Sequence, residues 1–123
     1  MTTIDARRVA QAEGVLESRL PTQRLSLEEA QHWIDRVAHG EDVDPPLVTR
    51  QPLARRLFGV ALADSHVIVV RHARPSQLTL LHELAHLMGN ENHGPAFQRT
   101  LTGLLSRHIS REAGRLMSEL LAE

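Results

Sequence analysis

The sequence contains no cysteine, no tyrosine and no lysine, and only 2% of its 123 residues are aromatic. Without cysteine, the chain can form neither a disulfide bond nor a thiolate metal site. All 14 positive residues are arginine, and 15 acidic residues offset them to a net charge of −1. Such a balance gives no clear nucleic acid signal. The length predicts a single domain over residues 1–123, with leucine, valine and alanine filling its core.

Long apolar runs are also missing. No stretch approaches the roughly 20 apolar residues of a membrane-spanning helix. The N-terminal residues 1–14 lack the apolar segment of a signal peptide. We therefore expect no membrane partner and a cytoplasmic location, whereas composition leaves the oligomeric state unknown.

The pattern of apolar residues predicts a small α+β fold, in which a catalytic core over 47–108 follows two N-terminal helices within 1–40. The second of these helices should begin at a capping box formed by Ser26 and Glu29. Two C-terminal helices are expected after residue 94, the last within 109–123. About three short strands should form an antiparallel sheet: residues 47–50, 58–63 and 66–71, the last two joined by a hairpin turn at Asp64-Ser65.

The segment His82-Glu83-Leu84-Ala85-His86 is the most informative pattern in the chain. It has the HExxH spacing of zinc-dependent hydrolases. Residues four apart lie one above the other on a helix, so His82 and His86 can hold one Zn²⁺ between them. Glu83 lies beside this pair, where it can accept a proton from a water activated by the zinc. Ser76 is a suitable N-cap for the helix, and Gly89 a suitable stop.

A catalytic zinc needs a third protein ligand and one open position. His93 follows His86 by seven residues and directly precedes Gly94-Pro95, where a new helix can start. We therefore favour His93 as the third ligand. Glu91 is the alternative, although it lies in the middle of the predicted loop.

These two motifs, HELAH and HGPAF, make residues 58–105 resemble the SprT-like branch of the zincin metallopeptidases. They also resemble small actinobacterial metallohydrolases that carry the same pair. The resemblance implies that His82, His86 and His93 bind zinc and that Glu83 is catalytic. Many SprT proteins carry a cysteine-rich module or a DNA-binding extension; we expect neither here, so the resemblance does not imply the DNA-linked role of those relatives. Metzincins fit less well, because their third histidine would fall at Asn92.

Other polar residues have weaker claims to function. His66, His72 and His108 are more typical of solvated or structural histidines than of ligands. Arg71 and Arg74 can stabilise an oxyanion but are more simply surface charges, and Arg55-Arg56 is too short a pair to indicate a phosphate site. Trp33 is expected to pack in the core.

Together these patterns predict a zinc metallopeptidase that acts on a protein or peptide substrate. One of the predicted strands, 58–63 or 67–70, should border the cleft as an edge to which a peptide can add. Two alternatives remain open. The chain can be a zincin-shaped binding or regulatory module in which zinc is structural, or a zinc amidohydrolase that acts on a non-peptide substrate.

Overall fold

The computed structural model describes residues 3–123, and these divide into two compact units. The sheet unit comprises Gln23–Gly89, and the helical unit combines residues 3–22 with Asn90–Glu123. Five helices and three strands are present in the described chain, which confirms the predicted α+β class. None of these helices is long and apolar enough to cross a membrane.

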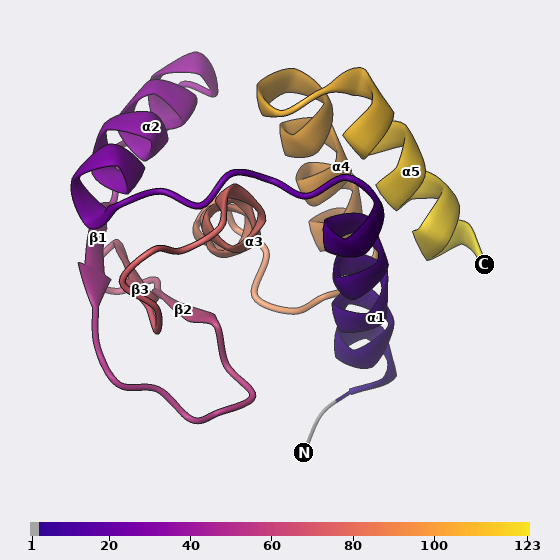
Figure 1. Cartoon of the computed structure of the whole chain (residues 1–123), viewed down its shortest axis with the longest axis horizontal. Coiled ribbons are helices and arrows are strands. Elements are labelled where there is room, and N and C mark those ends of the chain that lie inside the picture. The colour runs from indigo at the N-terminus through magenta and orange to yellow at the C-terminus, as the bar shows by residue number, and fades with distance from the viewer. Residues whose placement is uncertain (1–2) are drawn as a thin grey trace. The chain divides into compact units, whose positions relative to one another are not determined.

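The sheet unit begins with helix α2 and ends with helix α3, and three short strands lie between them (Figure 1). The predicted capping box starts α2. The side chain of Ser26 accepts a hydrogen bond from the Glu29 amide, and the Glu29 carboxylate accepts one from the Ser26 amide. Trp33 is buried on this helix, as expected. The elements of the unit are α2 (Leu27–Gly40), β1 (Leu47–Arg50), β2 (Gly59–Leu62), β3 (Val67–Val70) and α3 (Gln77–Leu87).

The strand order in the sheet is β1-β3-β2, so β3 is the central strand. The hairpin between β2 and β3 is confirmed, with Gly59 opposite Val70. The expectation of a wholly antiparallel sheet is wrong, because β1 pairs in parallel with β3 and Leu47 lies opposite Val67. The reason is topological. Strand β2 begins at the end of the sheet where β1 ends and therefore runs opposite to β1. The hairpin reverses the chain again, so β3 lies between the two and runs parallel to β1.

The helical unit consists of α1 (Ile4–Arg19), α4 (Pro95–His108) and α5 (Arg111–Ala122). Only two residues separate α4 from α5, so the two helices pack as neighbours (Figure 1). Helix α1 in turn contacts α5, and the guanidinium of Arg8 donates to the carbonyl of Leu121 near the end of that helix. The apolar stripes of these helices form the core of the unit: Val9, Ala12, Leu16, Phe97, Leu101, Leu104, Leu105, Ala113, Met117 and Leu121.

Candidate metal centre

Helix α3 carries the HExxH segment, and its own sequence fixes both of its ends. The Ser76 side chain accepts a hydrogen bond from the Thr79 amide at 3.1 Å and caps the first turn. Gly89 has φ +97°, a left-handed conformation that stops a helix and suits glycine. Between these ends the helix buries an apolar face, which holds the opposite face in a fixed orientation: Leu78, Leu80, Leu81, Leu84 and Ala85.

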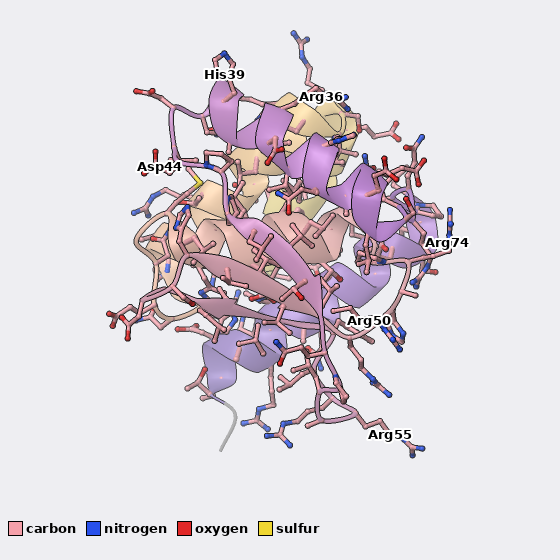
Figure 2. The ribbon with its side chains drawn as sticks, turned by 90° about the vertical axis from the view of Figure 1, so that its left-hand side faces the viewer. Arg36, His39, Asp44, Arg50, Arg55 and Arg74 are labelled. Atoms are coloured by element: carbon pink, nitrogen blue, oxygen red, sulfur yellow. The ribbon has the colours of Figure 1, made fainter. Side chains whose placement is uncertain are left out.

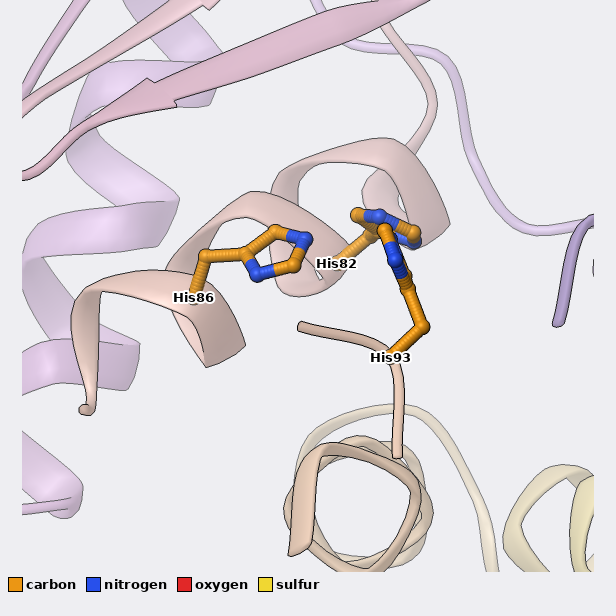
Figure 3. A group of neighbouring side chains, drawn as sticks. All are labelled: His82, His86 and His93. Atoms are coloured by element: carbon orange, nitrogen blue, oxygen red, sulfur yellow. The ribbon is translucent and has the colours of Figure 1, made fainter. Parts of the chain in front are cut away.

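The two helix histidines project side by side from successive turns. The rings of His82 and His86 have centroids 5.0 Å apart and are inclined by 65°. His93 completes a group in which each residue offers one ring nitrogen, and these nitrogens all lie within 4.8 Å of one another (Figure 3). All three side chains are half-buried. The structure therefore brings together the three histidines singled out in the sequence, and together they can bind a metal ion.

His93 is positioned by the start of helix α4. Pro95 is the first residue of that helix, as the sequence predicted, and Gly94 is its N-cap. The side-chain amide of Gln98 donates to the carbonyl of His93 at 2.9 Å, which ties the backbone of His93 to the first turn. The imidazole packs edge-on against Phe97, which is fully buried, with ring centroids 4.9 Å apart. These contacts restrict both the backbone and the ring of His93.

The chemistry of the donor set fits zinc. Three imidazole nitrogens and an open fourth position are a ligand set typical of catalytic zinc, with Zn–N distances of about 2.0–2.1 Å.

Glu83 is the one buried acidic residue among those that the structure describes, with 6% of its surface exposed. Its Oε2 lies 3.9 Å from Nε2 of His82. A buried carboxylate is costly unless polar groups or ions compensate it, so such residues concentrate at functional sites. Glu83 is adjacent to the histidine group without being one of its members, which suits a proton acceptor better than a ligand.

Strand β2 contacts Glu83 through Gly59, a residue that sequence reasoning did not single out. A Cβ atom built on Gly59 would lie 3.0 Å from Cγ of Glu83, 3.2 Å from its Oε2 and 3.2 Å from Cγ2 of Thr79. The absence of a side chain at this position therefore makes room for the carboxylate. The only signal in the sequence was a glycine at the start of a predicted strand, which is typical of a close approach between backbone and side chain.

The remaining candidates lie outside the histidine group. Glu91, the alternative third ligand, is exposed and is not a member of it. His66 is engaged elsewhere, with Nε2 2.6 Å from the carbonyl oxygen of Asp44. His72 stacks at 6.0 Å on Phe58, and His108 ends helix α4. The chain matches no known protein family, no curated protein and no solved structure.

Proposed function

We propose that this protein is a zinc-dependent metallopeptidase of the SprT-like zincin type. The observation that carries the proposal is the combination of three convergent imidazoles with a buried carboxylate beside them. His82, His86 and His93 would hold the metal. When bound, Zn²⁺ acts as a Lewis acid that lowers the pKa of water and polarises a carbonyl group.

Glu83 would move the proton in this reaction. Its carboxylate accepts a proton from water as the water oxygen attacks the peptide carbonyl. The same carboxyl group then gives that proton to the nitrogen of the leaving amine as the C–N bond breaks. This carboxylate is buried and lies against the backbone of β2 at Gly59.

Strand β2 supports the choice of a peptide as substrate. In the described chain it pairs with β3 on one side only, so its other edge is free to accept hydrogen bonds from an extended peptide. Of the two strands that the sequence left open, β3 is central in the sheet, so β2 is the strand to which we propose that a peptide adds. Because Gly59 in β2 lies against Glu83, a peptide added to β2 would pass close to the proton acceptor.

The test is the pair of variants Glu83→Gln and Glu91→Gln, each loaded with zinc and screened against unfolded proteins and peptides. Glu83→Gln retains the size of the side chain and removes its basicity. We expect its hydrolytic rate to fall by at least about 10²-fold with zinc content unchanged. The exposed Glu91→Gln variant should cleave like the wild type.

Cleavage by Glu83→Gln at the wild-type rate, after repurification to exclude contaminating proteases, would contradict the proposal. If the zinc-loaded wild type cleaves nothing and a protein partner binds both forms equally, the binding module is the better description. Cleavage of acyl amides but not of peptides would favour the amidohydrolase.

A further inference from the structure

One end of the sheet collects arginines from four separate segments of the chain. Strands β1 and β3 run in parallel and both end there, whereas β2 begins there. The arginines at this end lie at the end of β1, in the loop before β2, in the segment after β3, and at Arg24, which forms a β-bridge with Ser76. We call this group the arginine cluster: Arg24, Arg50, Arg55, Arg56, Arg71 and Arg74.

The positive charge of the arginine cluster is not balanced locally. Residues 47–76 contain five of its members and a single acidic residue, Asp64, which lies in the hairpin turn at the opposite end of the sheet. Figure 2 shows the same polarity, with Arg50, Arg55 and Arg74 on one side of the view and Asp44 on the other. Glu29 on α2 interacts electrostatically with one member of the cluster. Its pKa is lowered chiefly by its hydrogen bonds with Ser26 and to a smaller extent by the charge of Arg74.

Backbone carbonyls hold the arginines together without neutralising them. Arg50 donates from Nε to the carbonyl of Arg71 at 3.2 Å, and the guanidinium of Arg71 donates to the carbonyl of Arg55. Arg24 donates in the same way to the carbonyl of Arg74 at 3.2 Å. The exposed side chains of Arg55 and Arg56 make no such contact in the described part of the chain. Their planar forks are free to bind carboxylates in bidentate fashion.

The arginine cluster continues directly from the edge strand. Arg55 and Arg56 precede β2 by a few residues, and Phe58, which is 60% exposed, lies between them and Gly59. A peptide paired with β2 advances about 3.3 Å per residue, so it would reach the cluster within a few residues of the position opposite Glu83. Resting on the metallopeptidase function proposed above, we infer that the arginine cluster selects polypeptide substrates with Asp or Glu close to the scissile bond.

A single-stranded nucleic acid is the competing partner for such a surface. Its binding relies on aromatic platforms on which bases stack, as well as on positive charge. The chain has three aromatic residues in all, of which Phe58 alone lies beside the cluster. Continuity with a free strand edge instead favours a polypeptide.

The experiment uses zinc-loaded Glu83→Gln protein, so that binding is measured without hydrolysis. Fluorescence anisotropy compares a labelled Glu-rich peptide with its Gln-rich counterpart of equal length, for the parent and for Arg55→Glu/Arg56→Glu. The control, Arg111→Glu/Arg115→Glu on α5, makes the same change of net charge at exposed positions outside the cluster. We expect the Arg55/Arg56 reversal to weaken binding of the Glu-rich peptide about tenfold and the control to leave it within about twofold. A milder Arg55→Gln/Arg56→Gln variant replaces the reversal if zinc content or circular dichroism reports misfolding.

Equal affinity for the two peptides, equal losses in the two double variants, or tighter binding of a single-stranded oligonucleotide of matched charge would each overturn the inference. The outcome is separable from that of the proposed function. If Glu-rich peptides bind through Arg55 and Arg56 but the wild type never cleaves them, the peptidase function fails and the inferred substrate selection fails with it. If the wild type cleaves neutral and acidic peptides with equal kcat/KM, hydrolysis stands and the selection alone is wrong.

Discussion

The sheet unit and the helical unit each contain a glycine whose missing side chain leaves room for a neighbouring residue, and the two glycines have different roles. Gly59 leaves room for the carboxylate of Glu83, the flexible end of a side chain. Gly114 lets α5 approach α4, because a Cβ there would lie 1.8 Å from Oγ and 3.0 Å from Cα of Ser106. A missing Cβ thus makes room for a buried carboxylate in one unit and for the close packing of two helices in the other.

The two units also differ in what their helices contain. In the sheet unit, α3 carries two of the three clustered histidines and a buried acid. In the helical unit, α4 and α5 bury apolar side chains on both sides of Gly114. Changes on α3 should therefore alter metal binding and turnover, whereas changes between α4 and α5 should alter the free energy of unfolding.

Removing a ligand should have the largest effect. We expect His82→Ala, His86→Ala or His93→Ala to lower zinc affinity by at least about 10²-fold, because two imidazoles hold Zn²⁺ weakly. Glu91→Ala is the control and should bind zinc like the wild type. Competition with a chromophoric chelator gives the affinities, and elemental analysis gives the content. A greater loss of zinc affinity in Glu91→Ala than in His93→Ala would show that the third ligand is the carboxylate of Glu91 and not His93.

Lowering the pH should also release the zinc, without any substitution. Metal binding needs neutral imidazoles, and an unperturbed histidine titrates near pH 6.5, so zinc retention should fall steeply below about pH 6. Dialysis against metal-free buffers over a series of pH values, followed by elemental analysis, measures it. Retention that is flat from about pH 8 to about pH 4.5 would exclude histidine ligation.

Gly114→Ala should cause the largest loss of stability. The added methyl group meets Ser106 near its backbone, so α4 and α5 have to separate, at a cost of about 1–3 kcal/mol. Gly14→Ala is the matched control in the same unit, because a Cβ there has no neighbour within 4 Å. A helical glycine replaced without a clash should gain about 0.5–1 kcal/mol. Urea unfolding measures the free energy of unfolding of both variants. Equal midpoints for Gly114→Ala and Gly14→Ala would show that the close approach at Gly114 does not affect stability.

Gly59→Ala should give a smaller change in stability but a distinct change in activity. The added Cβ displaces Glu83 by a few tenths of an ångström, and misplacing a general base lowers kcat about tenfold while zinc content is unchanged. Thr79→Ser removes the other neighbouring atom and should partly restore kcat in the double variant. A rise in KM alone, with kcat unchanged, would show that Gly59 serves substrate binding and not Glu83.

The smallest effect concerns Glu29, which lies away from the site. The hydrogen bonds with Ser26 lower its pKa, so the folded protein favours the charged form. This contribution to stability is present above the pKa of the unfolded chain and is lost as pH falls through the lower folded value. Glu29→Gln should therefore be less stable than the wild type at neutral pH, and the difference between their urea midpoints should shrink in acid. A difference independent of pH would assign the effect to packing.

The local features of both units could be predicted from the sequence alone. The capping box at Ser26, the N-cap at Ser76 and the helix start at Pro95 are all where the sequence predicted them. So is the hairpin between β2 and β3. Each depends on residues within a few positions of one another, and the side-by-side placement of His82 and His86 follows in the same way from the helical repeat alone.

The features that join distant segments could not be predicted in this way, because they depend on how the whole chain folds. The parallel pairing of β1 with β3 depends on where the hairpin inserts, and it leaves β3 in the centre with β1 and β2 as the two edge strands. The hydrogen bond between Arg50 and Arg71 follows from that pairing, and the contact of Gly59 with Glu83 follows from the packing of β2 against α3. Local preferences carry no information on these contacts, because strand order is set by burial of the whole sheet and by the path of the connecting loops.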